Sequence, residues 1–101
     1  MSRILLAPEV EDDFERIFNF SFERSPEYAA QRIQAIMAAI DILETSPLIG
    51  RPVAYKQREL VISTGPSGYL ALYRYDAMAD IAYVLAVRSQ REQDYKRSGD
   101  W

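Results

Sequence analysis

The chain has 101 residues, of which 49% are hydrophobic, and this length suits a single domain with one core. It contains neither cysteine nor histidine, which excludes disulfides, thiolate metal sites, and the commonest general base and zinc ligand. We expect no metal or cofactor, and the formal net charge of −3 argues against direct nucleic-acid binding by the chain alone.

The first expected element is a strand over Arg3–Leu6, an apolar run that Pro8 closes and that is typical of a sheet edge. Pro8 and Glu9 come too early for a signal peptide, and no apolar run approaches the roughly 20 residues that cross a bilayer. We therefore expect a cytoplasmic protein without a membrane partner.

A helix from Glu9 to about Arg24 should follow, because apolar residues recur with the helical period. Its predicted buried stripe is Val10, Phe14, Ile17, Phe18 and Ser21. Acidic residues crowd its first turns, where the helix dipole favours them, so they do not indicate a metal site. Phe20 lies off the stripe and is a candidate exposed contact.

A second helix should start at Ser25 and Pro26, a capping hydroxyl followed by proline at the first helical position, and end near Glu44. Its predicted apolar face is Ala30, Ile33, Ile36, Met37, Ile40 and Leu43. Ile42 points nearly the opposite way and is a second candidate exposed contact. The short connection predicts an antiparallel helical hairpin.

Three strands are expected in the second half, at 58–63, 68–76 and 81–87, while Gly50–Pro52 should be a turn or loop. The strands should form an antiparallel meander with the hairpin on one face. This is an α+β fold of order β-α-α-β-β-β. We expect one domain over residues 1–101, with a polar tail from about residue 96.

The last two strands are apolar on both faces, whereas a half-exposed antiparallel strand should alternate apolar and polar residues. The helices of so short a chain can cover one face only. We therefore predict that the other face, which carries Leu70 and Leu72, is covered by a second molecule. Both leucines are candidate contacts for a target or an inhibitor.

Several short fragments, in this order and spacing, resemble the toxins of the RelE/ParE superfamily from type II toxin–antitoxin systems. They are Ser25–Ala30, Leu43–Pro47, Gly50–Pro52, Arg58–Leu60, Gly68–Tyr69, Tyr73–Tyr75 and Leu85–Arg91. The resemblance covers nearly the whole chain. It implies a small α+β toxin, neutralised by a dedicated antitoxin, of the ribbon-helix-helix type or similar, that folds its C-terminal segment over the toxin.

The family divides by target, and the sequence resembles the ParE-like branch, whose members poison DNA gyrase. The RelE-like branch cuts messenger RNA on the ribosome and often has lysines on the strand before the Gly-Tyr turn and an arginine directly after it. Here that strand is Leu60–Ser63 and Leu70 follows the turn. Ser89 stands where many members have a histidine. These residues favour a gyrase inhibitor. The alternatives are a ribosome-dependent endoribonuclease and a degenerate toxin that serves only as an antitoxin-binding co-repressor.

Four arginines and one tyrosine are the candidate polar site residues. The arginines, which could bind a target or an antitoxin carboxylate, are Arg58, Arg74, Arg88 and Arg91. If the chain were a nuclease, Arg74, Arg88, Arg91 and Tyr95 would form its site. The alternative for the arginines is surface salt bridges with Glu59, Asp76, Asp80 or Glu92. The alternative for Tyr95 is an anchor for the C-terminal tail, because a tyrosine with an ordinary pKa near 10 is a poor base.

Overall fold

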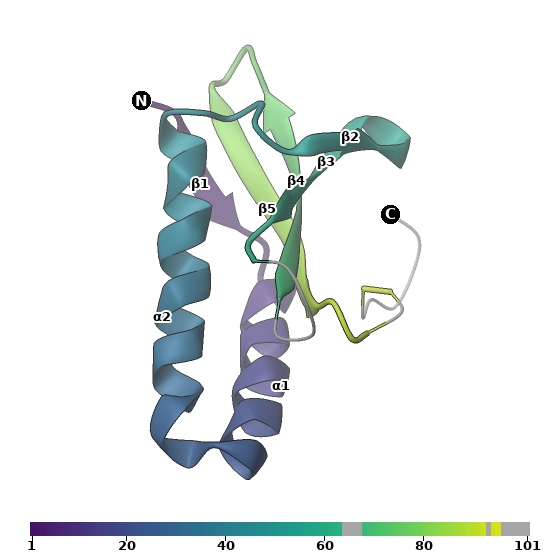
Figure 1. Cartoon of the computed structure of the whole chain (residues 1–101). Coiled ribbons are helices and arrows are strands. Elements are labelled where there is room, and N and C mark those ends of the chain that lie inside the picture. The colour runs from purple at the N-terminus through teal and green to yellow at the C-terminus, as the bar shows by residue number, and fades with distance from the viewer. Residues whose placement is uncertain (64–67, 93, 96–101) are drawn as a thin grey trace.

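The computed structural model describes residues 1–63, 68–92, 94 and 95, which form a five-stranded sheet with two helices against it (Figure 1). The elements are β1 (Arg3–Leu6), α1 (Glu9–Arg24), η1 (Pro26–Tyr28), α2 (Ala29–Ile40), η2 (Asp41–Glu44), β2 (Arg51–Val53), η3 (Ala54–Lys56), β3 (Gln57–Val61), β4 (Tyr69–Asp76) and β5 (Ile81–Ser89). The predicted α+β fold is confirmed. The predicted tail from about residue 96 lies outside the described residues.

The strands lie in the order β1-β5-β4-β3-β2. Strands β3, β4 and β5 form the predicted antiparallel meander, and β1 pairs in parallel with β5 at one edge. The prediction of a turn or loop at Gly50–Pro52 is wrong in part, because Arg51–Val53 pairs with β3 as a fifth strand. So short a strand with a proline carries almost no sequence signal, and its place at a sheet edge is where proline is tolerated.

The two helices cover one face of the sheet and bury the core between them and it (Figure 1). Along α1, the predicted stripe is confirmed, with Val10 at 0% and Ile17 at 4% exposure. In the second helical region, the buried stripe runs through Ala29, Ile36, Ile40 and Leu43. In the described part of the chain, no helix has both the length and the apolar character that a membrane span requires.

Three details of the second helical region differ from the prediction. Ser25 makes no side-chain capping hydrogen bond. Ala30 and Met37 are exposed, because the stripe is displaced by one position onto Ala29. The region also begins and ends as 3₁₀ helix rather than as one continuous α-helix. None of these differences alters the hairpin, since Ile36 and Ile40 still face the core.

A β-bulge between β4 and β5 changes which residues of the last strand face the core. The register runs from Leu72 opposite Ala86 to Tyr73 opposite Val84, so β5 has one extra residue, Leu85, at this point. An extra residue exchanges the faces of the strand. Val84 before the bulge and Val87 after it therefore both belong to the core on the helix side.

Two buried polar contacts fix the elements around the core. The Asp13 carboxylate, 1% exposed, accepts a hydrogen bond of 2.9 Å from the backbone N–H of Val87 and thereby joins α1 to β5. The Tyr73 hydroxyl donates to the carbonyl of Pro47 and accepts from the N–H of Gly50, both at 2.8 Å. The second contact holds the segment before β2 against β4.

Candidate binding site

The four predicted arginines do not form one cluster. Arg58 donates to the backbone carbonyls of Leu48 at 3.1 Å and Gly50 at 2.8 Å, and so supports the turn before β2. The guanidinium of Arg74 lies 4.9 Å above the ring of Tyr83 on the neighbouring strand. Arg88 and Arg91 lie at two separate sites, Arg88 beside Tyr95 and Arg91 in a pocket next to α1.

The acids proposed as alternative partners bind other groups. Glu59 pairs with Arg51, and Glu92 pairs with Arg16 at 2.7 Å. Asp80 accepts from the Tyr75 hydroxyl at 2.6 Å, and Asp76 accepts from backbone N–H groups in the β4–β5 turn. Arg51 and Arg16, which the sequence analysis does not single out, are therefore the cations that these two glutamates hold.

The first of the two sites is on the sheet face away from the helices and joins Tyr95 to β2, β3 and β5. The Tyr95 hydroxyl donates a hydrogen bond of 2.6 Å to Oε2 of Glu59, while Arg51 from β2 binds Oε1 of the same carboxylate. The guanidinium of Arg88 lies 5.1 Å from the centre of the Tyr95 ring. Tyr95 thus anchors the chain after β5 to the sheet, in line with the alternative role that the sequence suggested for it.

The electrostatics of this cluster oppose a catalytic role for Tyr95. Burial raises the pKa of its phenol, and the hydrogen bond to the Glu59 carboxylate raises it further, so the group stays protonated far above neutral pH. For Glu59, burial favours the neutral acid, but the bonds from Tyr95 and Arg51 outweigh it and hold the pKa below its usual value. The acceptor of the Tyr95 hydroxyl is therefore already an ionised, paired carboxylate.

This pairing predicts an acid-sensitive contribution to stability. Because the pKa of Glu59 is lower in the folded chain than in the unfolded one, its stabilising effect is complete above the unfolded value of 4.5 and disappears as the pH falls through the folded value. We expect Glu59→Gln to flatten the fall in the free energy of unfolding between about pH 6 and pH 3. Urea titrations over that range measure it.

The matched control for this prediction is Glu15→Gln, which removes an exposed acid of α1. It should leave the shape of the stability–pH curve unchanged. An equally steep loss of stability in the Glu59→Gln variant and in the unsubstituted chain would show that the Glu59 carboxylate makes no net stabilising contact.

The prediction that Leu70 and Leu72 form a bare apolar face is wrong, since each is only 5% exposed. The register places Leu72 between Glu59 and Ala86, and Leu70 between Val61 and Arg88. The Glu59–Tyr95 bond shows that the chain after β5 folds back over this side of the sheet. The chain therefore covers these two leucines itself, and neither is accessible to an inhibitor in this conformation.

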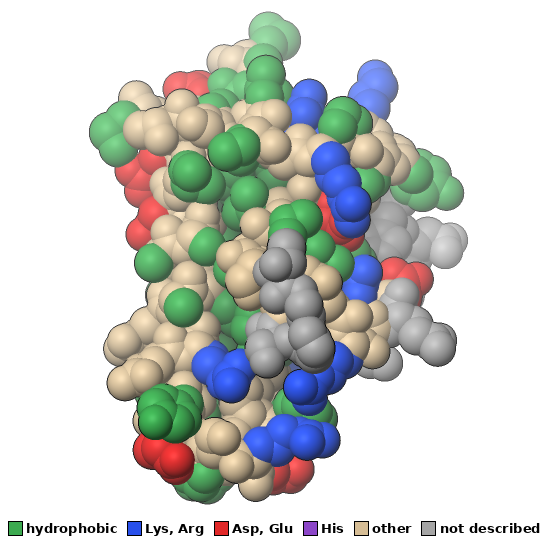
Figure 2. Space-filling model, viewed as in Figure 1, with side chains coloured by type: hydrophobic (Ala, Val, Ile, Leu, Met, Phe, Trp, Pro, Cys, Tyr) green, Lys and Arg blue, Asp and Glu red, His purple; other side chains and the backbone are tan. Residues whose placement is uncertain are grey.

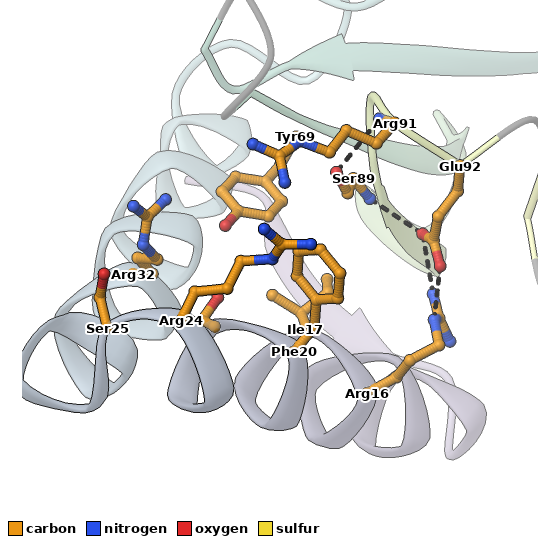
Figure 3. Close-up of a pocket in the computed structure, with 11 residues that line it drawn as sticks. Arg16, Ile17, Phe20, Arg24, Ser25, Arg32, Tyr69, Ser89, Arg91 and Glu92 are labelled. Atoms are coloured by element: carbon orange, nitrogen blue, oxygen red, sulfur yellow. Dashed lines mark hydrogen bonds and ion pairs between the residues drawn. The ribbon is translucent and has the colours of Figure 1, made fainter.

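The second site is a pocket of about 380 Å³ between the second half of α1 and the adjoining end of the sheet (Figure 3). Helix α1 contributes Ile17, Phe20 and Arg24, which are spaced by three and four residues and so share one side of the helix. Arg32 enters from α2. Figure 2 shows Lys and Arg side chains gathered over this lower half of the visible face.

The sheet contributes a second group of residues to this pocket. Tyr69 begins β4, and Arg91 and Glu92 follow β5. Glu92 accepts from Arg16 and, at 3.0 Å, from the N–H of Ser89, so its carboxylate fixes the end of β5 against α1. Arg91 lies 5.6 Å from the centre of the Phe20 ring. The pocket thus contains two predicted residues, Arg91 and Phe20.

The two candidate apolar contacts, Phe20 and Ile42, are both exposed. Phe20 is 43% exposed at the pocket, with the Arg24 guanidinium 4.4 Å above its ring. Ile42 is 42% exposed on η2, which does not contribute to the pocket. A role in binding remains a prediction for each.

The sequence analysis missed three of the pocket's arginines, Arg16, Arg24 and Arg32. A signal for two of them exists, because Arg16, Phe20 and Arg24 follow one another at intervals of four residues on one face of α1. No comparable signal exists for Arg32, whose position depends on how the hairpin packs. Within the described residues, no group of three or more acids lies close enough to hold a metal ion.

The fold is that of a small α+β protein with two helices against a five-stranded sheet, and solved structures share it. The structure of the chromosomal ParDE toxin–antitoxin system from P. aeruginosa superposes with a TM-score of 0.75 at 19% identity, covering 88% of this chain and 96% of that one. A metal-bound toxin from Helicobacter pylori gives a TM-score of 0.52 at 14% identity, covering 93% of this chain and 100% of that one. At these identities, the likeness shows the fold.

Sequence comparison then gives the family. Residues 4–94 match the family described as the ParE toxin of the type II toxin–antitoxin system parDE. The protein named Toxin RelE1 of Caulobacter vibrioides is 35% identical over 71 residues, which cover 70% of this chain and 76% of that protein. The chain belongs to the ParE toxin family of type II toxin–antitoxin systems.

Proposed function

We propose that this toxin inhibits DNA gyrase by binding to it in the cytoplasm, and that a cognate antitoxin with a ribbon-helix-helix or similar DNA-binding domain neutralises it. Membership of the ParE family supports the choice of target. The observation that carries the proposal is the state of Tyr95, whose hydroxyl is a hydrogen-bond donor to an ionised carboxylate. A toxin that acts by binding has no need of a general base at this place.

A supercoiling assay with purified chain and purified gyrase tests the proposal. We expect supercoiling to be inhibited, gyrase–DNA cleavage complexes to accumulate, and both effects to disappear when the antitoxin is added first. The matched control is the chain unfolded by heat before mixing. Normal supercoiling at a large excess of folded chain, with no cleavage complexes, would contradict the proposal.

The second candidate function is a ribosome-dependent messenger endoribonuclease. Its specific support is the contact of Arg88 with Tyr95, since a cation beside a phenol is one arrangement for phosphate cleavage. Tyr95→Phe separates the two functions, because it removes only the hydroxyl. We expect this variant to remain toxic, whereas a nuclease that uses the Tyr95 hydroxyl as acid or base would lose about 10²–10⁴-fold in cleavage rate.

Mapping of messenger ends after induction reads out this difference. Messages that stay intact in cells expressing the unsubstituted chain contradict the nuclease. Codon-specific cleavage that Tyr95→Phe abolishes would contradict the gyrase proposal. Normal growth at high expression without the antitoxin would instead support a degenerate toxin that acts only as an antitoxin-binding co-repressor.

A further inference from the structure

The pocket between α1 and the sheet has an excess of positive charge although the whole chain is acidic. Among the described residues, it is lined by four arginines and one acid: Arg16, Arg24, Arg32, Arg91 and Glu92. Arg16 is neutralised by Asp13 and Glu92, at 2.9 and 2.7 Å. Within the described part of the chain, neither Arg24 nor Arg32 has a carboxylate within 4.0 Å.

The side chains around these charges are apolar and aromatic. Ile17 is 4% exposed in the wall of the pocket, and Phe20 presents its ring to the guanidinium of Arg24 (Figure 3). A guanidinium stacked on a ring keeps its N–H groups in its own plane, at the edge, where they remain able to bind an anion. This contact places the Arg24 guanidinium over the Phe20 ring without neutralising its charge.

The dimensions and the charge together favour a peptide over a nucleic acid. A volume of about 380 Å³ is at the lower end of the range for ligand pockets, and it suits a few side chains rather than a nucleic-acid strand. Phosphate backbones are bound by extended positive surfaces, while this chain has a net charge of −3. Arginine pairs geometrically with a planar carboxylate through two N–H groups.

We propose that this pocket binds an acidic segment of the cognate antitoxin, with a carboxylate between Arg24 and Arg32 and a neighbouring bulky apolar side chain against Phe20. The inference rests on the antitoxin partnership of the proposed function, but not on the cellular target. It gives the antitoxin segment a defined chemistry, one Asp or Glu beside a large apolar residue. In such a complex, Arg24 and Arg32 gain the carboxylate partner that the described part of the free chain does not give them.

The experiment uses the full-length toxin bound to immobilised full-length antitoxin, and it measures the toxin dissociation rate at several salt concentrations. We expect Arg24→Gln and Arg32→Gln, which keep much of the side-chain length, each to raise this rate about 10-fold or more, as the loss of a charge-assisted bond predicts. Arg24→Glu and Arg32→Glu should raise it further. Lys56→Glu, a charge reversal on the distant η3, is the matched control and should change it less than about twofold.

Charge exchange separates recognition from an indirect effect on folding. Each Asp and Glu of the antitoxin is replaced in turn by Arg and tested against toxin Arg32→Glu, and we expect one replacement to restore slow dissociation. Unchanged dissociation of the Arg24 and Arg32 variants, or restoration by none of the replacements, would overturn the inference. So would tight binding of labelled single-stranded RNA or duplex DNA to the free toxin that Arg24→Gln abolishes. The gyrase assay is independent of each of these results.

Discussion

Replacing Asp13 with alanine should lower the free energy of unfolding by about 3 kcal/mol, a large part of the stability of a domain of this size. The Asp13 carboxylate is 1% exposed, accepts from the N–H of Val87 and pairs with Arg16 at 2.9 Å. Removing it leaves a buried N–H without an acceptor and a half-buried cation with one partner fewer. Urea denaturation followed by circular dichroism measures the change.

The neighbouring acid provides the control for this prediction. Asp12 also lies in the first turns of α1 but is exposed, so Asp12→Ala should cost no more than about 0.5 kcal/mol through the helix dipole. Equal effects of the two substitutions would mean that Asp13 contributes only as a first-turn acid. Asp13→Asn should fall between them, because an amide oxygen still accepts from Val87 but no longer carries charge.

Replacing Tyr73 with alanine should be at least as damaging, at about 4 kcal/mol, because Tyr73 is the largest fully buried side chain. Tyr73→Phe isolates the hydroxyl, which binds the carbonyl of Pro47 and the N–H of Gly50. We expect that variant to cost about 2 kcal/mol, since it leaves both backbone groups unpaired. The same denaturation experiment measures both values.

Tyr75→Phe is the matched control for the hydroxyl of Tyr73. Tyr75 is on the same strand and donates to Asp80 at 2.6 Å, but this bond is exposed to solvent. Its loss should cost no more than about 0.5 kcal/mol. If the two phenylalanine variants were equally stable, the Tyr73 hydroxyl would not hold the segment before β2.

Local patterns in the sequence were sufficient for most of the fold. The stripe of α1 follows a period of 3.6 residues, while β1 and the strands of the meander are short apolar runs, and each of these signals lies within one element. The short strand β2 and the bulge at Leu85 could not be predicted in this way. Both depend on pairing with residues of another strand, which a single sequence does not display.

The candidate site was less predictable than the fold, for a related reason. Arg88 and Tyr95 are close in sequence and were correctly considered together, but the acceptor Glu59 lies 36 residues before Tyr95. The role of Asp13 was hidden for another reason, because acids in a first helical turn are expected on dipole grounds alone. In both cases, the role of a polar residue depends on a partner that is distant in sequence rather than on its sequence neighbours.

The sheet face that carries Leu70 and Leu72 was expected to be exposed, and the contact made by Tyr95 lies on this face. The apolar pattern of the last two strands predicts an open surface over Leu70 and Leu72, with a polar tail only from about residue 96. A single phenol bound to Glu59 shows that the chain folds back there. Both leucines then reach 5% exposure. The arginine-lined pocket at the end of the sheet, by contrast, keeps Phe20 43% exposed.

The order in which the strands are synthesised differs from their order in the sheet. The ribosome makes β1 first and β5 last, yet β5 lies inside the sheet and is the partner of both β1 and β4. Translation must therefore have passed β5 before the nascent chain can assemble its sheet. A fragment that ends before β5 lacks the strand with which both β1 and β4 pair, so we expect it not to form this sheet.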